Sequence, residues 1–414
     1  MKKFIFTISA LAFFASACFL SAGFATALPR GVIVNGRDVG GLSYSRATRA
    51  LREDVEKQLK DKILKIYAGE RIYEYSYPEI YYADCFDKWL KKIDKKGEFR
   101  LPVFYYLNGA DKICDYVCES VEKEVVEPYA VFNYEGEPFT YYEGGDGVRA
   151  DREKLIKDVS KALNGGDGEV RVALENVERK KDISAVRNST VKLYSFTTYF
   201  DSSNVERCAN IKLAAGKING AVIPAGECFS FNQTVGARTP ENGYKPAKII
   251  EDGKFVLGVG GGVCQVSTTL YNAVLLAGLS IAEYHPHSLP VSYVAPSRDA
   301  MVSGSYCDLK FVNNRNTPIY VRMKCTASSI CCTVYGESDG FDYSFQSKVV
   351  GIIPKAEEEI VEGDDDRVLS FGKDGLESEG YLIKERDGER AESLIRKDKY
   401  APIAPVRQVR KNAP

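Results

Sequence analysis

The spacing of hydrophobic positions at the start of the chain predicts a small α+β unit. In GVIVNGRDVG, Val32 and Val34 alternate with polar residues as in a strand, and Asn35-Gly36 is typical of a tight hairpin. Apolar residues then recur at helical spacing over residues 47–55, and ILKIYAGERIYEYSY predicts a second hairpin. We therefore expect a ββαββ arrangement from residue 31 to about residue 77.

A related pattern returns about a hundred residues later. Asp151 can cap a helix in REKLIKDVSKALNGG, which ends at a glycine pair, and EVRVALENV then alternates as a strand. This weak internal repeat predicts one N-terminal region over residues 31–185, built from two related α+β units.

The second half of the chain is richer in strand signals. SFTTYF, VIPAGECFSF, TPIYVRMKC and ICCTVYG read as strands, and one main helix is expected over residues 264–277. These segments predict a domain over residues 190–340. Beyond EEEIVEGDDD, short strands with a hairpin at Asp387-Gly388 predict a small β module or arm over residues 357–412. The fold class is therefore a multi-domain α+β protein.

The N-terminal segment predicts export. Lys2 and Lys3 precede an apolar run that reaches Leu28, and Ala25-Thr26-Ala27 matches a cleavage site. Residues 1–28 are interpreted as a signal peptide, with a membrane anchor or a lipoprotein signal at Cys18 as alternatives. All three place the body of the protein outside the cytoplasm.

The charge balance argues against one class of partner. The chain has 56 basic and 57 acidic residues, giving a formal net charge of −1. A nucleic-acid-binding protein needs a basic surplus or stripe, so nucleic acid is not expected as a partner. No cofactor is indicated.

The string GGGVCQVSTTLYNA carries the main candidate chemistry. It places Cys264 in the first turn of the expected helix, where unpaired N–H groups and the helix dipole lower a thiol pKa. Gly260, Gly261 and Gly262 allow the backbone to approach either another strand or a ligand.

The two histidines of the chain, His285 and His287, follow this helix. Either one can act as a base for Cys264, and Asp299 or Asp308 can orient the imidazole. The side chain of Gln265 is a candidate oxyanion donor.

Three other interpretations of the same residues stay open. The cysteine and the histidines can line a binding groove without catalysis, or they can serve packing alone. A metal site formed by Cys264 and both histidines is the least favoured, because further ligands are not evident nearby.

The eleven cysteines predict disulfides if the chain is exported. Cys325 and Cys331 or Cys332 lie on either side of a hairpin around Ser328-Ser329. The pairing cannot be deduced from spacing.

The long stretches TTYFDSSNVERCANIKLAAGKINGAVIPAGECFSFNQTVGARTPENGY and KIIEDGKFVLGVGGGVCQVSTTLYNAVLLAGLSIAEYHPHSLPVSYVAPSRDAM resemble the VanW family over about residues 195–335. GVIVNGRDVGGLS and the later VRADREKLIKDV are similar to a YoaR-like domain to which peptidoglycan binding is ascribed. The tail is similar to a small β module named for its five glycines.

The resemblance implies a cell-envelope protein associated with peptidoglycan, in a family linked to vancomycin resistance whose activity is not settled. It implies a groove or site that includes the following residues: Arg238, Gly260–Gly262, Cys264, Gln265, His285, His287, Ser288, Arg298 and Asp299. Cys208, Cys228 and Cys307 depart from the family pattern and are expected to form added disulfides. A disulfide to Cys264 would exclude catalysis.

Two functions follow from the resemblance and the motifs. The first is binding or scaffolding of peptidoglycan through its glycan or stem peptide, with membrane contact through the N-terminal segment. The second is thiol-dependent acyl or peptidyl transfer, or hydrolysis, on peptidoglycan, with Cys264 as the nucleophile.

Overall fold

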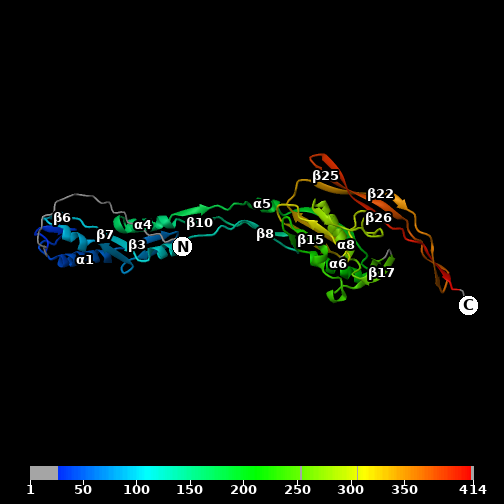
Figure 1. Cartoon of the computed structure of the whole chain (residues 1–414), viewed down its shortest axis with the longest axis horizontal. Helices are drawn as coiled ribbons and strands as arrows, with labels where there is room; N and C mark the ends of the chain where they lie inside the picture. Colours follow the sequence, from blue (N-terminus) through cyan, green and yellow to red (C-terminus); the bar gives the residue numbers. More distant parts are fainter. Residues whose placement is uncertain (1–26, 252–253, 305, 412–414) are drawn as a thin grey trace. The chain divides into compact units, whose positions relative to one another are not determined.

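The computed structural model describes residues 27–251, 254–304 and 306–411, which form two units (Figure 1). The first unit contains the described residues up to Val126 together with Asp146–Glu178, and the second contains Glu127–Gly145 and everything from Arg179 onward. The predicted signal or anchor lies almost entirely outside the described residues. Within those residues, none of the helices combines the length and the apolar character that a membrane crossing requires.

The first unit contains four small sheets and four α-helices. Its elements are β1 (Val32–Val34), β2 (Arg37–Asp38), α1 (Tyr44–Lys60), β3 (Leu64–Ala68), β4 (Arg71–Tyr75), β5 (Ile80–Asp84), α2 (Phe86–Trp89), the 3-10 turn η1 (Leu90–Lys92), β6 (Gly97–Phe99), β7 (Val103–Leu107), α3 (Ala110–Glu119), β10 (Gly147–Ala150), α4 (Arg152–Gly165), β11 (Glu169–Arg171) and β12 (Leu174–Val177). The sheet orders are β2-β1-β6, β11-β3-β4, β10-β12 and β5-β7.

The local signals in this unit act as predicted. The Ser43 hydroxyl and the Asp151 carboxylate accept the backbone N–H groups of Arg46 and Lys154, which caps α1 and α4. Strand β11 pairs in parallel with β3, so the second half of the repeat completes the sheet of the first. Both helices bury their apolar faces in one core.

The second unit holds the remaining elements. They are β8 (Tyr129–Phe132), β9 (Phe139–Tyr142), α5 (Ile183–Asn188), β13 (Val191–Tyr199), α6 (Val205–Ile218), β14 (Ala221–Ile223), β15 (Cys228–Ser230), α7 (Phe231–Val235), η2 (Pro240–Asn242), β16 (Pro246–Glu251), β17 (Lys254–Val259), α8 (Val263–Leu276), β18 (Ser280–Glu283), β19 (Lys310–Val312), β20 (Ile319–Cys325), β21 (Ser329–Gly336), β22 (Asp342–Ile353), β23 (Glu359–Gly363), β24 (Arg367–Ser370), β25 (Gly375–Arg386), β26 (Glu389–Tyr400) and β27 (Val406–Arg410).

Helix α8 lies at the centre of the second unit. The sheet β13-β21-β20-β14 packs against it, and α6 contacts it from another side. The helix is buried on nearly every face, although its first half is rich in hydroxyl groups. Those groups are hydrogen-bonded: Thr269 pairs with Thr198 at 2.8 Å, and Ser267 donates to the Ala300 carbonyl at 2.6 Å. Burying a hydroxyl group costs free energy unless the group forms a hydrogen bond. This pairing therefore allows the polar half of α8 to lie inside the protein.

Helix α6 corrects the prediction of a single main helix in this region. It is as long as α8, at 14 residues, and it packs Ile211, Ala214 and Ile218 into the core. Asn210 lies on the same buried face and donates to the Lys245 and Gly261 carbonyls, so a polar residue interrupts the hydrophobic pattern that would have indicated the helix.

The C-terminal strands are longer than predicted. Strands β22, β25 and β26 have 12 residues each and form the sheet β22-β25-β26, in which β22 precedes the expected boundary at residue 357. Because their sequences carry many charged residues, these strands depend on their long, continuous pairing with one another. The hairpin at Asp387-Gly388 forms as predicted, with positive φ angles of 53° and 83°.

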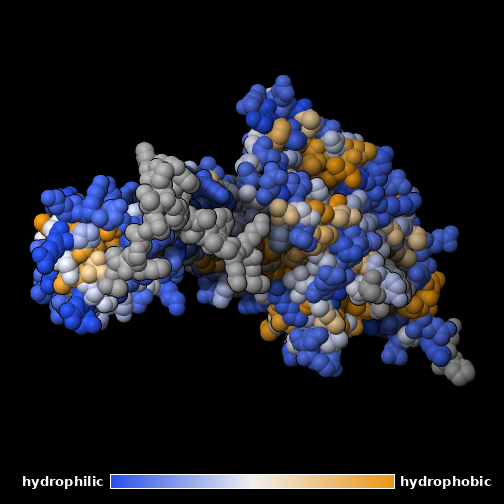
Figure 2. Space-filling model, turned by 60° about the vertical axis from the view of Figure 1, so that its left-hand side comes forward, coloured by the Kyte–Doolittle hydropathy of each residue, from blue (hydrophilic) through white to orange (hydrophobic). Residues whose placement is uncertain are grey.

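The face shown in Figure 2 is mostly hydrophilic, with hydrophobic side chains in smaller groups between the hydrophilic ones.

Candidate functional site

The triple glycine shapes the loop between β17 and α8. A Cβ on Gly261 would lie 2.7 Å from the Lys248 carbonyl oxygen of β16, and one on Gly262 would lie 2.9 Å from Cγ of Arg207. Gly262 also has a φ of 105°, which side chains rarely adopt. The space that side chains on these glycines would need is therefore filled by the protein itself. This close packing of the loop fixes the start of α8.

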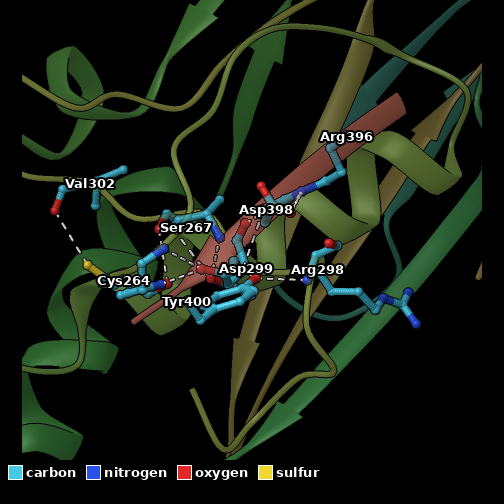
Figure 3. Close-up of polar contacts among 12 residues, drawn as sticks. Cys264, Ser267, Arg298, Asp299, Val302, Arg396, Asp398 and Tyr400 are labelled. Atoms are coloured by element: carbon cyan, nitrogen blue, oxygen red, sulfur yellow. Dashed lines mark hydrogen bonds and ion pairs between the residues drawn. The ribbon is translucent and has the colours of Figure 1, made fainter. Parts of the chain in front are cut away.

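Cys264 is the second residue of α8, and the residue is half-buried. Its Sγ donates to the Val302 carbonyl oxygen at 3.4 Å (Figure 3). The N–H groups of Val263 and Gln265 donate to Gly260 and Gly262, whereas the Cys264 N–H finds no acceptor within the described part of the chain. The helix therefore presents a thiol and a free backbone donor at the same residue.

His287 joins this thiol to a buried carboxylate. Its side chain is buried, and both its backbone N–H and its ring Nδ1 contact Oδ2 of Asp299 at 2.7 Å. A carboxylate partner assigns the proton to Nδ1 and leaves Nε2 for another group. The ring also acts on the Cys264 thiol, and each of the two groups shifts the pKa of the other.

The charges of these three residues support one another. Burial raises the pKa of the Cys264 thiol, but the hydrogen bond and charge of His287 outweigh it, helped by Arg238, and the net pKa is lowered. Burial lowers the pKa of His287, whereas Asp299 and Cys264 raise it to about 9. Burial also raises the pKa of Asp299, but the His287 and Tyr400 hydrogen bonds bring it below its usual value. The arrangement favours a thiolate, an imidazolium and a carboxylate in series.

Two arginines hold positive charge close to the thiol. Arg238 packs against Gly260, donates to Asn232 Oδ1 at 2.5 Å, and has a buried Nε without a hydrogen-bond partner among the described residues. Burial lowers the pKa of both Arg207 and Arg238, and the charge of Cys264 opposes this effect in each. Neither arginine forms a salt bridge with an acidic side chain in the described part of the chain, although the charge of Asp308 acts on Arg238.

The side chain of Gln265 does not serve as the expected oxyanion donor. It is 1% exposed, and its Nε2 donates to the Thr198 hydroxyl and the Tyr199 carbonyl, both at 2.9 Å. Its Oε1 accepts from Arg207 at 2.6 Å. Since every polar atom of the amide is engaged, Gln265 ties α8 to β13 and α6.

The structure separates three other predicted residues from this group. His285 pairs with Glu283 at 2.9 Å, so His287 alone takes the place of the base. Arg298 bonds Asn272, lies over the Phe196 and Phe345 rings, and points away from Cys264 in Figure 3. Ser288 is exposed, and its carbonyl accepts the Ala401 N–H.

Asp299, and not the alternative Asp308, is the carboxylate that contacts His287. Asp308 accepts from the Ser230 hydroxyl at 2.6 Å and from the Asn232 N–H at 2.9 Å. No three histidine, cysteine or acidic residues of the described ranges are arranged to hold a metal ion.

Sequence reasoning missed Tyr293 and the residues supplied by β26. The Tyr293 hydroxyl interacts with Thr268, and burial together with the charge of Cys264 raises its pKa. Tyr400 and Arg396 contact Asp299 from more than ninety residues away. A fuller recognition of α6 would have indicated Arg207, but no local pattern marks Tyr293 or Tyr400.

The expected disulfides are not formed. All ten described cysteines are free thiols: Cys85, Cys114, Cys118, Cys208, Cys228, Cys264, Cys307, Cys325, Cys331 and Cys332. In the β20–β21 hairpin, the register places Cys325 opposite Ile330 and Cys331 opposite Lys324, so these two cysteines do not face each other. Cys264 therefore remains available.

The residues around this site match a known family. Residues 206–335 match the family described as VanW like protein. The chain carries a VanW-like domain over residues 206–335. It is 45% identical to the uncharacterized protein YoaR of Bacillus subtilis (strain 168) over 171 residues, which are 41% of this chain and 56% of that protein. It is 34% identical to the vancomycin B-type resistance protein VanW of Enterococcus faecalis (strain ATCC 700802 / V583) over 128 residues, 30% of this chain and 46% of that protein.

The chain thus spans about half the length of these VanW-family relatives. One solved structure, titled "Crystal structure of HP0197-G5", is 19% identical to this chain and aligns with 16% of it and 97% of the other, with a TM-score of 0.10. The VanW match contains Cys264, His287 and Asp299 and ends before β22.

Proposed function

We propose that this VanW-family protein is a thiol-dependent acyl- or peptidyl-transfer enzyme, transferase or hydrolase, of the bacterial cell envelope. The supporting observation is the buried Asp299–His287 pair, whose imidazole interacts with the Cys264 thiol at the start of a helix strongly enough that each group shifts the pKa of the other. A nucleophile, a base and a group that orients the base are the parts that covalent acyl transfer requires. A purely structural cysteine has no need of a buried imidazole and carboxylate.

The reaction proceeds in two halves. The Cys264 thiolate attacks the substrate carbonyl carbon, and the oxygen that becomes negative accepts a hydrogen bond from the Cys264 N–H. As the C–N bond breaks, protonated His287 gives its Nε2 proton to the leaving amine, which leaves a thioester on Cys264. Water or an acceptor amine then attacks the thioester and passes its proton to His287, which restores the thiolate.

The positive charge of Arg207 and Arg238 suggests the substrate class. A guanidinium that forms no salt bridge within the described residues can bind a substrate carboxylate through two parallel hydrogen bonds. Peptidoglycan stem peptides carry free carboxylates beside amide bonds. The name of the enterococcal relative, which records resistance to the cell-wall antibiotic vancomycin, supports the same choice of substrate.

We further propose that the protein is extracytoplasmic, with residues 1–28 as signal or anchor, and that residues 31–185 bind the glycan or stem peptide. One surface of the first unit supports binding. Tyr81 of β5 and Tyr106 of β7 are exposed and stacked, with ring centroids 6.1 Å apart, and the neighbouring Phe104 is also exposed. Exposed aromatic faces of this kind suit the apolar faces of sugar rings.

Turnover of defined muropeptides tests the enzymatic proposal. The purified protein is incubated with muropeptides released from sacculi, in forms with free and with amidated stem carboxylates, and the products are measured by mass spectrometry. We expect loss of an amino acid or transfer of a peptide, faster with the free carboxylates. Cys264→Ala should abolish turnover, while Cys228→Ala, which removes an exposed thiol of β15, should retain it.

Sedimentation with intact sacculi separates catalysis from binding. Cys264→Ala should still sediment with sacculi, because it lacks only the nucleophile. Full turnover by Cys264→Ala would remove the enzymatic proposal and leave a binding protein. Failure of the wild-type protein to sediment would remove the binding role of residues 31–185.

A further inference from the structure

We infer that the C-terminal sheet β22-β25-β26 belongs to the catalytic unit, with Tyr400 and Arg396 as positioning residues for Asp299. This inference rests on the proposed function of Cys264, His287 and Asp299. It extends that function beyond the VanW match, which ends at residue 335.

Tyr400 contacts both the Asp299 carboxylate and the backbone close to it. The residue is 1% exposed, and its hydroxyl donates to Asp299 Oδ1 at 2.6 Å. The same hydroxyl oxygen accepts the backbone N–H of Ser297 at 2.8 Å. One hydroxyl group therefore contacts both the backbone of the loop that carries Asp299 and the Asp299 carboxylate.

Arg396 holds the same residue at two further points. Its side chain is fully buried; Nη1 donates to the Asp299 carbonyl oxygen at 2.9 Å, and Nη2 lies 3.5 Å from Oδ1. Its Nε donates to Asp398 at 2.6 Å, and its guanidinium lies over the rings of Tyr271 and Tyr284. Figure 3 shows Arg396, Asp398 and Tyr400 on one strand that passes Asp299.

These contacts divide the two oxygens of Asp299 between two tasks. Oδ2 receives the ring and backbone N–H groups of His287, while Oδ1 receives Tyr400 and Arg396. A carboxylate held on both edges cannot rotate, so the imidazole that it orients is fixed as well. Because Asp398 is paired with Arg396, the buried charge of Asp299 is left to balance a protonated His287.

The sheet and the residue that follows it also form hydrogen bonds near both ends of the segment that carries His287 and Asp299. Ser378 of β25 hydrogen-bonds the Ser297 hydroxyl at 2.7 Å, and the N–H of Ala401 donates to the Ser288 carbonyl at 2.7 Å. Polar contacts at Ser288, next to His287, and at Ser297, two residues before Asp299, place the segment with a precision that apolar packing alone does not provide.

Tyr400→Phe tests this role, since it removes one hydroxyl and keeps the ring. We expect kcat on the muropeptide substrate to fall about 10- to 100-fold, as is typical when a group that orients a catalytic residue is lost. KM should stay unchanged, because Tyr400 does not touch the substrate. The alkaline limb of the kcat profile should move upward, because a carboxylate that loses one donor interacts more strongly with the His287 proton.

Tyr381→Phe is the matched control. Tyr381 lies on β25 of the same sheet and also donates to a carboxylate at 2.6 Å, that of Glu379, which has no contact with Asp299 in the described structure. Tyr381→Phe should leave kcat and the pH profile unchanged. If the thermal unfolding midpoint shows that Tyr400→Phe is not folded, Arg396→Lys, which keeps the charge but not the forked contact, should show the same loss of kcat.

The outcomes separate the two proposals. If Tyr400→Phe behaves like Tyr381→Phe while Cys264→Ala is inactive, the inference about the C-terminal sheet is wrong and the proposed function stands. If Cys264→Ala is active, the proposed function itself fails.

Discussion

Helices α3 and α8 carry cysteines in similar local settings, yet their thiols differ in chemistry. Each helix begins directly after a glycine with positive φ, Gly109 or Gly262. Cys114 of α3 is fully buried among apolar residues, and this burial raises its pKa to about 11. Cys264 of α8 meets an imidazole, and its pKa is lowered.

Burial alone raises the pKa of a thiol and makes the thiol unreactive. A positively charged partner lowers the pKa again. Cys114 lies in the second turn of its helix, beyond most of the influence of the helix N-terminus, while Cys264 lies in the first. The partner of Cys264 comes from a loop that packs onto the helix. The chemical difference is therefore made by tertiary contacts and by a shift of a few positions along a helix.

The strongest way to break this comparison is to disable the orienting carboxylate. Asp299→Asn keeps the size of the side chain but no longer favours the Nδ1–H tautomer of His287, so kcat should fall by about 10⁴. Steady-state turnover of muropeptides measures the effect. Asp308→Asn, which alters a buried carboxylate outside the triad, is the control, and a similar kcat for the two variants would contradict the assignment of Asp299.

Thiol labelling gives a smaller but more direct contrast. The pKa of Cys114 is raised to about 11, so at neutral pH it carries about 100 times less thiolate than a thiol of ordinary pKa. The pKa of Cys264 is lowered, so Cys264 carries more thiolate than an ordinary thiol. Iodoacetamide at pH 7 should therefore modify Cys264 more than about 100-fold faster than Cys114, as read by peptide mass spectrometry.

The pH dependence of this labelling has a definite sign. The pKa of His287 is raised to about 9, so the imidazolium that stabilises the thiolate persists up to that pH and is lost above it. Labelling of Cys264 should change little from pH 9 down to pH 7, whereas labelling of Cys114 should rise toward pH 11. His287→Gln should abolish the difference in their pH profiles, and an unchanged Cys264 profile in that variant would be inconsistent with the pair.

The smallest expected effect concerns stability. Cys114→Ser places a hydroxyl among apolar side chains and should lower the free energy of unfolding by about 1–3 kcal/mol. Cys264→Ser should cost less than about 1 kcal/mol, because its hydroxyl has polar partners in the Val302 carbonyl and in His287. Urea unfolding of both variants measures the difference, and equal losses would show that the two sites are equally apolar.

Local signals predicted much of the fold and the centre of the site. Turns that need positive φ, helix caps and the glycine-preceded Cys264 are encoded by neighbouring residues, so pattern analysis can find them. The choice between His285 and His287 was open because Glu283 and Asp299 decide it through tertiary contacts. Gln265 looked available for catalysis because its partner Arg207 lies on α6, which the hydrophobic pattern did not reveal.

The contact of Arg396 with two aromatic rings has a consequence for dividing the chain into domains. A fragment that ends at residue 335 would uncover the faces of Tyr271 and Tyr284 that the guanidinium covers. The shortened protein would then display a new apolar surface, which favours self-association. Strand β26, and not the end of the VanW match, thus sets the shortest length of chain that keeps these rings covered.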